Sequence, residues 1–442
     1  MNPDKTRKHA LEIFKAGVDA ADPIKLINEA VDLKGHSITI KGSTFDISTY
    51  ENIYIIGIGK AAAAMALPLE KILGDFFTEG IIIVKYGHTL PLKKVRIIEA
   101  GHPVPDEAGY KGAQECAGIL QRSGSKDLIF FLISGGGSAL FPYPVNGLTL
   151  ADKQKTTNVL LDAGADIQEI NTLRKHLSQI KGGRSAQLAY PATLISLILS
   201  DVIGDELESI ASGPTVPDTS TFADCLGIIN KYNIKDSLPP AAWEIFNKGI
   251  KGEIEETPKS GDPVFEKTHN MIIGNNLLAL KAAREKAEKL GYNTLLLSTS
   301  IQGESREAAK LHAAIAREIL DSRNPIKPPA CVLSGGETTV TIHGQGQGGR
   351  NQEFVLAAAI EIAGMKNTTL LSCGTDGTDG PTDAAGAITD GTTVNRAVNM
   401  KMDPAHYLKA NDSYHFFNRL NDLVITGPTF TNVMDLRIIL VV

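Results

Sequence analysis

The chain is poor in cysteine and has no cysteine pairs. Its 442 residues include only four, at Cys116, Cys225, Cys331 and Cys373. None stands at the short spacing of a metal-binding or redox pair. Scattered thiols of this kind are typical of a reducing compartment, so we expect a cytoplasmic protein.

Long apolar segments are also missing. No run approaches the ~20 apolar residues that cross a bilayer. The first residues carry charges throughout an amphipathic pattern and lack the apolar core of an export signal. We therefore expect no membrane partner.

The chain has no excess of positive charge. Its formal net charge is −6 and its sequence pI is about 6.0. No cluster of lysine and arginine is long enough to form a basic arm, so nucleic acid is not an expected partner. Small anionic ligands remain compatible with local sites.

Two common kinase signatures are absent. A Walker A motif needs Gly-Lys-Ser or Gly-Lys-Thr, whereas Lys60 follows a glycine but precedes Ala61. The motifs of protein kinases do not occur either. These absences exclude both of those kinase classes.

The length exceeds what one hydrophobic core commonly supports, so two domains are expected. Apolar, β-branched runs alternate with alanine-rich helical stretches, which is typical of α/β proteins with parallel sheets. We expect a first domain over residues 1–246 with a mainly parallel, Rossmann-like sheet, a charged linker or exposed excursion over 247–267, and a second α/β domain over 268–442. The strand-like runs are 53–56, 81–84, 128–133, 194–199, 271–273, 294–297, 330–333, 370–372 and 435–442.

A glycine turn follows the first strand-like run. Gly57 and Gly59 begin a G-x-G-x-x-A pattern, which by itself is weak support for a dinucleotide site. A NAD site also needs an acid at the end of the next strand, but that strand ends at Lys85. Lys60, at the start of the following helix, is a candidate ligand for a phosphate or carboxylate. The alternative is a solvated surface lysine.

Two apolar runs end in Ser-Gly-Gly, where open α/β sheets bind ligands. The first, which we call the glycine-rich loop, can surround an oxyanion with backbone N–H groups. It consists of Ser134, Gly135, Gly136, Gly137 and Ser138. The second replaces the third glycine with Glu337, which predicts a polar wall with one carboxylate. A flexible turn is the alternative for the first loop.

Two further candidates lie beside likely element ends. Arg350 follows two glycines at a predicted helix start, where its planar guanidinium can hold a carboxylate or a phosphoryl group. Alternatively it pairs with Glu353 on its own helix. Asp201 follows a strand-like run and is a candidate base or metal ligand, better placed than Asp205.

Three acids and three glycines lie in one turn-rich segment, 376–383, which we call the aspartate loop. Asp376, Asp379 and Asp383 can converge there because glycines permit close backbone approach. Mg²⁺ with substrate phosphates is the expected ligand. The spacing excludes an EF-hand. A solvated acidic turn is the alternative.

Eight ordered blocks resemble the type 2 (MOFRL) glycerate kinases, and the resemblance runs from about residue 8 to Val442. They are Gly57–Lys60, Ser134–Ser138, Asn171–Ser178, Ser200–Asp205, Ser334–Glu337, Gly348–Glu353, Asp376–Asp383 and Thr431–Arg437. The resemblance implies two dissimilar α/β domains with the active site in the cleft between them. It also implies ATP-dependent phosphorylation of D-glycerate to 2-phosphoglycerate with a divalent metal, and it places Lys60 and Arg350 in the cleft.

The residues leave several assignments open. Either Lys60 or Arg350 could hold glycerate while the other holds ATP, and either Asp201 or Asp379 could accept the hydroxyl proton. An NAD(P)H-dependent hydroxypyruvate reductase is one rival function, supported locally only by the glycine turn. A non-enzymatic nucleotide sensor is another, which leaves Arg350 and the three acids unexplained. The oligomeric state, including a homo-oligomer, is also open.

Overall fold

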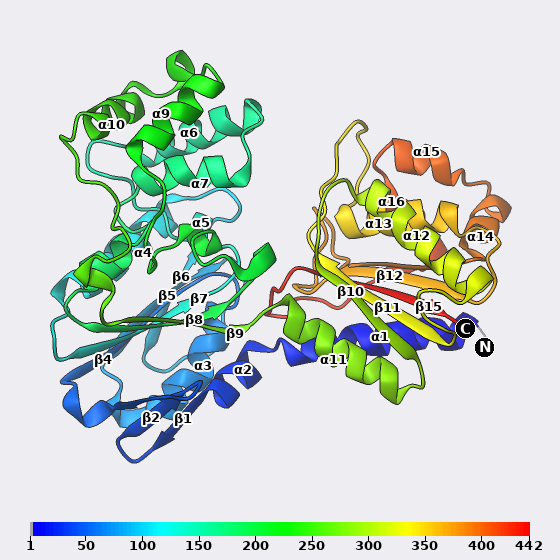
Figure 1. Cartoon of the computed structure of the whole chain (residues 1–442), viewed down its shortest axis with the longest axis horizontal. Coiled ribbons are helices and arrows are strands. Elements are labelled where there is room, and N and C mark those ends of the chain that lie inside the picture. Colours follow the sequence, from blue (N-terminus) through cyan, green and yellow to red (C-terminus); the bar gives the residue numbers. More distant parts are fainter. Residues whose placement is uncertain (1–2) are drawn as a thin grey trace. The chain divides into compact units, whose positions relative to one another are not determined.

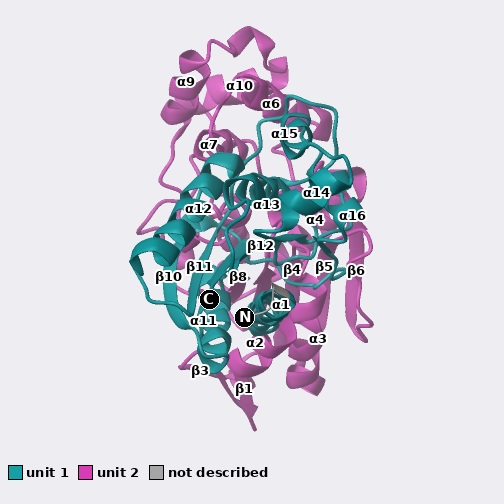
Figure 2. Cartoon of the chain, turned by 90° about the vertical axis from the view of Figure 1, so that its right-hand side faces the viewer, with its two compact units in different colours: residues 1–22, 201–204, 274–442 teal, residues 23–200, 205–273 magenta. Residues whose placement is uncertain are grey.

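The computed structural model describes residues 3–442, which form two compact units. Unit 1 contains residues 3–22, 201–204 and 274–442, and unit 2 contains residues 23–200 and 205–273; Figure 2 colours them separately. The division therefore differs from the expected consecutive domains 1–246 and 268–442. The N-terminal segment joins unit 1 because helix α1, Pro3–Ala20, packs on α11 and on two strands of that unit.

Unit 2 is built on a six-stranded sheet in the order β6-β5-β4-β7-β8-β9. Four neighbouring pairs, from β6 through β8, are parallel. The strands are β4 (Asn52–Ile58), β5 (Glu79–Lys85), β6 (Val95–Ala100), β7 (Asp127–Ile133), β8 (Thr193–Leu199) and β9 (Thr268–Gly274). Strands β7 and β8 are buried throughout, as their continuous apolar runs predict for strands covered on both faces. The expected mainly parallel sheet is confirmed.

Helices cover both faces of this sheet. Helix α3 (Ala62–Leu73) packs on β4 and β5, and α4 (Glu107–Arg122) packs on β5 and β6 from the other side (Figure 1). Short helices α2 (Pro23–Ala30), α5 (Gly137–Leu140) and α8 (Arg184–Ala189) complete the layer arrangement. A separate antiparallel sheet contains β1 (Val31–Lys34), β2 (Ser37–Ile40) and β3 (Ser43–Asp46).

Four helices of unit 2 form a group with its own apolar core. They are α6 (Leu150–Asp162), α7 (Ile167–His176), α9 (Phe222–Lys231) and α10 (Pro240–Ile250). Leu160, Leu173 and Phe246 are buried in that core. Helices α6, α7 and α9 each begin with a capping box, in which a Thr or Asp side chain and an acid three residues later satisfy each other's backbone N–H groups.

The segment 247–267, expected as a linker, is part of unit 2. Helix α10 continues to Ile250, and Thr257 is buried with its hydroxyl donating to Asp218 at 2.9 Å. The polar residues of this segment therefore include groups that form specific hydrogen bonds with the rest of unit 2. Composition alone does not distinguish such a segment from a solvated linker.

Unit 1 contains a mixed six-stranded sheet in the order β10-β11-β15-β12-β13-β14. The strands are β10 (Asn293–Ile301), β11 (Ala330–Gly336), β12 (Thr368–Gly374), β13 (Gly386–Asp390), β14 (Leu423–Val424) and β15 (Asp435–Val441). Only β10 and β11 pair in parallel; the C-terminal strand β15 lies antiparallel between β11 and β12. The first residue of β15, Asp435, thereby lies beside the ends of both neighbours, opposite Gly336 and Gly374.

Helices again lie on both sides of the sheet (Figure 1). Helices α1 and α11 (Asn276–Lys289) cover one face, and α12 (Ser305–Ser322) and α13 (Arg350–Glu361) cover the other. The remaining helices are α14 (Thr393–Asn399), α15 (Pro404–Lys409) and α16 (Ser413–Leu420). The two units are thus dissimilar α/β domains, as expected.

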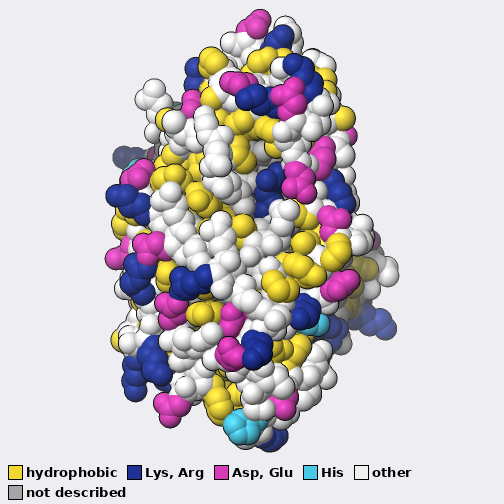
Figure 3. Space-filling model, turned by 90° about the vertical axis from the view of Figure 1, so that its left-hand side faces the viewer, with side chains coloured by type: hydrophobic (Ala, Val, Ile, Leu, Met, Phe, Trp, Pro, Cys, Tyr) yellow, Lys and Arg dark blue, Asp and Glu magenta, His cyan; other side chains and the backbone are white. Residues whose placement is uncertain are grey.

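The surface agrees with the composition. Acidic and basic side chains are interspersed on the face drawn in Figure 3, with no field of one sign. No helix within residues 3–442 is long and apolar enough to cross a membrane. All four cysteines are buried and free.

Candidate active site

The turn after β4 is shaped by close packing. Gly57 lies inside β4, where a Cβ would come within 2.6 Å of the Ile82 side chain. Gly59 has φ of +116°, and a Cβ there would collide with Ser134. The two glycines therefore serve strand packing and the approach of two turns.

The glycine-rich loop is joined to this turn by hydrogen bonds. The Lys60 N–H donates to the Gly135 carbonyl at 2.9 Å, and the Ala61 N–H donates to Ser134 Oγ at 3.1 Å. The buried Ser134 side chain therefore links the two turns through this hydrogen bond. Gly137 also packs internally, against Ile58.

Gly136 and Ser138 face a cavity of about 500 Å³ within unit 2. A Cβ on Gly136 would lie 2.9 Å from the His102 ring and 3.6 Å from Lys60 Cγ. Glycine is thus required where the loop meets His102. The lining residues are His102, Pro103, Val104, Pro105, Gly136, Ser138, Ala139, Lys153, Gln154, Thr157, Asn158, Leu161 and Arg174. We call this space the cation cavity.

Two cations in the cation cavity have no acidic partner. Lys153 of α6 is only 5% exposed, and Arg174 of α7 is half-buried. Among residues 3–442, no carboxylate forms an ion pair with either. Burial and the charge of Arg174 lower the pKa of Lys153 to about 7, and burial lowers the pKa of Arg174. Unpaired buried cations are costly unless an anion compensates them.

A third lysine, Lys181, holds the glycine-rich loop in place through hydrogen bonds to Ser138. Lys181 is 1% exposed, and its Nζ donates to the carbonyl and the hydroxyl of Ser138, both at 3.0 Å. Ser138 Oγ lies 3.0 Å from Ser212 Oγ, and the Ser212 hydroxyl donates to Asn171 Oδ1. Burial, with the charges of Lys153 and Arg174, lowers the pKa of Lys181 well below its usual value.

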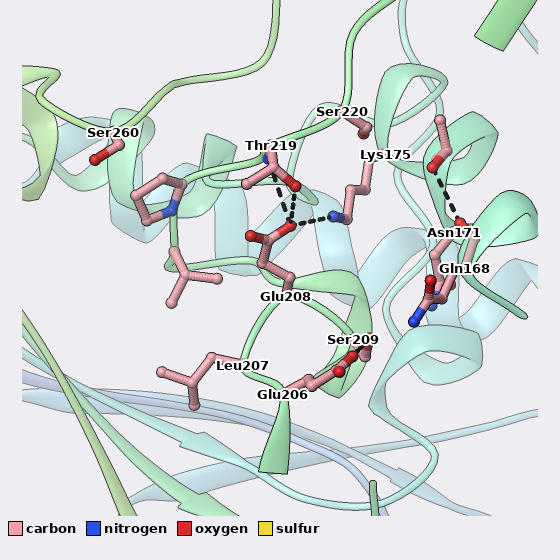
Figure 4. A pocket seen from close by; sticks show the side chains of 13 residues that line it. Gln168, Asn171, Lys175, Glu206, Leu207, Glu208, Ser209, Thr219, Ser220 and Ser260 are labelled. Carbon is pink, nitrogen blue, oxygen red and sulfur yellow. Dashed lines mark hydrogen bonds and ion pairs between the residues drawn. The ribbon is translucent and has the colours of Figure 1, made fainter. Parts of the chain in front are cut away.

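A neighbouring cavity of about 790 Å³ provides a contrast (Figure 4). Its lysine, Lys175, donates to Glu208 at 3.3 Å and to buried Asp218 at 3.0 Å. Figure 4 shows Glu208 also accepting from Thr219. The charge of Lys175 is therefore balanced within the protein, unlike that of Lys153.

In unit 1, Arg350 begins α13 and is held by two acids. Its Nε and Nη2 donate to the carboxylate of Asp435 at 2.8 and 2.9 Å, and its Nη1 lies 2.7 Å from Glu337. Burial opposes the charge, but Asp435 and Glu337 raise the pKa of Arg350 above its usual value. The alternative pairing with Glu353 is wrong, because Glu353 accepts from Arg306 at 2.8 Å. Glu337 is the predicted polar wall.

The aspartate loop does not gather its acids. Asp379 is 2% exposed and accepts the backbone N–H groups of Asn351 and Gln352 at 3.0 and 2.8 Å, so it caps the start of α13. Asp376 accepts from Thr378 in a local turn, and Asp383 accepts from the Tyr414 hydroxyl. Burial outweighs the hydrogen bonds and raises the pKa of Asp379 to about 6.

The three acids therefore do not converge, and a role for any of them toward a Mg²⁺ ion that arrives with substrate phosphates stays a prediction. Within the described part of the chain, no group of three or more His, Cys, Asp or Glu side chains is placed to hold a metal ion. The carboxylates accept hydrogen bonds from backbone N–H groups and a hydroxyl. The sequence pattern could not show whether an acid binds such donors or a metal ion. The donor set does not fit a protein-built Mg²⁺ cage.

Asp201 follows β8 and belongs to unit 1, where its carboxylate accepts from Asn432 Nδ2 at 3.2 Å. Asn432 is three residues before Asp435. Lys153, Arg174 and Asp435 were absent from the sequence-based candidates. For Lys153 a signal existed: with Thr156 and Leu160 it occupies the buried face of α6 at i, i+3 and i+7.

Comparisons with known proteins agree with these features. Residues 9–247 match the family described as a domain of unknown function, DUF4147, and residues 330–435 match the MOFRL family. A glycerate 2-kinase of Pyrococcus horikoshii is 42% identical over 98% of this chain and 97% of its own length. A protein of Agrobacterium vitis, named provisionally as a hydroxypyruvate reductase, is 40% identical over 100% of this chain and 95% of its own.

The solved structure of a glycerate kinase from Thermotoga maritima superposes with a TM-score of 0.87. It is 40% identical, and the match covers all of both chains. Sequence and fold thus agree over the full length, and both family matches fall on segments that carry the residues described above. The chain belongs to the MOFRL-type, or type 2, glycerate kinase family.

Proposed function

We propose that this chain transfers the γ-phosphoryl group of ATP to the 2-hydroxyl of D-glycerate, giving 2-phosphoglycerate and ADP. One observation carries the proposal: the 42% identity, over nearly the whole of both chains, with a relative named glycerate 2-kinase. Members this similar over their full length commonly share their chemistry. The site geometry is compatible with that reaction.

Phosphoryl transfer depends mainly on positioning and on cations around the phosphoryl oxygens. The glycine-rich loop, with Lys60 beside it, belongs to unit 2, and Arg350 belongs to unit 1. We assign Lys60 to a phosphate oxygen and Arg350 to the carboxylate of glycerate, for which its planar fork is suited. Arg350 already contacts Asp435 and Glu337. The carboxylate of glycerate would therefore displace the half-exposed Glu337 from Arg350, or bind Arg350 beside it, and would leave buried Asp435 in place.

The base is assigned to Asp201. Its carboxylate follows β8 and accepts a hydrogen bond from Asn432 Nδ2, which orients it. Asp379, the other candidate, has both oxygens engaged by the first turn of α13 and is buried, so it is poorly placed to accept a substrate proton. Asp201 would take the proton of the attacking hydroxyl as the new P–O bond forms.

Mg²⁺ is proposed to arrive with the nucleotide. It commonly binds through phosphate oxygens and water with one or two carboxylates, which does not require a protein cage. When bound, it would neutralise part of the phosphate charge. The aspartate loop is not assigned to it.

Reduction of hydroxypyruvate is a second candidate because of the relative from Agrobacterium vitis. The glycine turn between β4 and α3 has the required position for a dinucleotide. However, β5 ends at Lys85 where NAD-binding proteins carry an acid for the ribose hydroxyls. We therefore expect neither NADH nor NADPH to bind.

One assay separates these functions. Purified protein is incubated with ATP, MgCl₂ and D-glycerate, and the products are followed by ³¹P NMR, which distinguishes 2-phosphoglycerate from 3-phosphoglycerate. A parallel sample receives hydroxypyruvate and NADH or NADPH. Formation of 2-phosphoglycerate is expected; reduction of hydroxypyruvate without ADP formation from glycerate would overturn the proposal, and 3-phosphoglycerate would correct its regiochemistry.

A further inference from the structure

We infer that the cation cavity is the nucleotide site, with Lys153 and Arg174 holding the triphosphate and Val104 and Leu161 covering the base. This inference deepens the proposed function and rests on it for the identity of the nucleotide. The site lies entirely within unit 2, and its residues come from α6, α7, the glycine-rich loop and the segment 102–105.

Charge is the first argument. Lys153 and Arg174 both line the cavity, and no carboxylate among the described residues offsets them. The neighbouring Lys175 has two acidic partners, so balancing a buried lysine is possible in this helix group. A cavity that keeps its cations unbalanced is suited to an anionic ligand.

The amount of charge distinguishes between possible anions. A single carboxylate, as in glycerate, needs one cation. A triphosphate carries three to four negative charges and can use Lys153 and Arg174 together. The volume of about 500 Å³ lies within the range of small-molecule sites.

The apolar rim is a second, independent argument. Val104 is 65% exposed and Leu161 is 55% exposed, and both line the cation cavity. Large apolar side chains left open beside unpaired cations form a surface with one apolar and one positive region. A nucleoside triphosphate has the matching two parts, a flat base and a polyanion.

The glycine-rich loop is held ready for this ligand. Lys181 donates to Ser138, and a chain of hydroxyls continues through Ser212 to Asn171. These bonds fix the loop at the wall of the cavity before any ligand binds, which lowers the cost of ordering on binding. Lys181 is thus a positioning residue.

The test measures binding, without phosphoryl transfer. Isothermal titration calorimetry of the full chain uses ATP and, separately, inorganic tripolyphosphate as probes. Lys153→Met should weaken both at least ~30-fold, as loss of one partner in a buried charge pair does. Arg174→Gln should weaken both about tenfold. Leu161→Asp should weaken ATP more than tripolyphosphate.

Lys155→Met is the matched control, because Lys155 lies on the same helix and is exposed. It makes the same charge change and should leave both affinities within about twofold. Thermal unfolding without ligand checks folding: Lys153→Met should be at least as stable as the wild type, because it removes an unpaired buried charge. If Lys153→Met fails to fold, the ATP and tripolyphosphate affinities of Arg174→Gln test the inference instead.

Three outcomes would overturn the inference. Unchanged ATP affinity in both Lys153→Met and Arg174→Gln would make these cations structural. Weakened D-glycerate binding with unchanged tripolyphosphate binding would assign the cavity to the carboxylate substrate. An equal loss of ATP and tripolyphosphate affinity in Lys155→Met would show that the losses come only from the change in net charge. Because none of these measurements uses turnover, a failed kinase assay would leave them interpretable.

Discussion

Asp435 holds the guanidinium of Arg350 through two hydrogen bonds of 2.8 and 2.9 Å, and it accepts a third from Arg437 at 3.2 Å. Asp435 and Arg437 are both buried, and two nitrogens of Arg437 have no hydrogen-bond partner. One carboxylate therefore balances two arginines at the start of β15. Its position between β11 and β12 makes this possible.

The first prediction concerns that carboxylate. Asp435→Asn should lower the free energy of unfolding by about 3–5 kcal/mol, because it leaves buried Arg437 without its balancing charge. Glu337→Gln, which removes the exposed partner of Arg350, should cost less than about 1 kcal/mol. Urea unfolding measures both. Equal losses for the two variants would contradict the asymmetry.

The second prediction concerns the aspartate loop. Asp379→Asn replaces an acceptor with an amide that cannot serve both N–H groups of α13, so stability should fall by about 1–3 kcal/mol. Asp383→Asn affects an exposed bond to Tyr414 and should change stability by less than about 0.5 kcal/mol. Chemical unfolding of the two variants at one pH is the measurement. A stable Asp379→Asn variant would return Asp379 to the list of candidate ligands.

Much of the fold could be predicted because its strands are continuous apolar runs. Eight of the nine predicted runs fall within observed strands, and the ninth, 435–442, extends one residue beyond β15. The antiparallel insertion of β15 could not be predicted, since it depends on pairing between segments about 100 and 70 residues apart. The N-terminal helix was misplaced for the same reason.

The site was less predictable. Glycine positions correctly marked where turns approach each other, but spacing could not show that a Cβ at Gly57 or Gly59 would collide with neighbouring protein atoms. Acid spacing likewise could not show that Asp379 caps a helix. Lys153 was overlooked because a buried lysine looks like a surface residue unless its helical face is examined.

The third prediction concerns His312 of α12. The Ala308 carbonyl can only accept, so Nδ1 donates to it at 2.7 Å and Nε2 accepts from the Ser334 hydroxyl at 2.8 Å. Burial, opposed by the Ala308 bond and assisted by Arg437, lowers the pKa of His312 to about 4. The unfolded chain, with a pKa near 6.5, therefore binds more protons between those values.

Stability should consequently fall as the pH decreases from 6.5 to 4. The His312 contribution is about 3 kcal/mol at ~1.4 kcal/mol per pKa unit. Wild type and His312→Gln are compared by urea unfolding at several pH values, so that carboxylates common to both cancel. The difference should shrink toward pH 4; parallel curves would mean that His312 does not titrate differently on folding.

The last prediction follows from the unpaired lysine in the cation cavity. Burial, with the charge of Arg174, lowers the pKa of Lys153 to about 7, so its amine is largely neutral at pH 8.5. A bound triphosphate places negative charge beside it and should raise that pKa. ATP binding at pH 8.5 should therefore take up protons.

Calorimetry in Tris and in HEPES measures this uptake, because the two buffers release protons with different enthalpies. Burial lowers the pKa of Lys181 as well, but Lys181 is present in both proteins, so Lys153→Met should take up about one proton fewer than the wild type. Lys155→Met should match the wild type. Proton release on binding, or equal uptake by wild type and Lys153→Met, would show that Lys153 does not face the triphosphate.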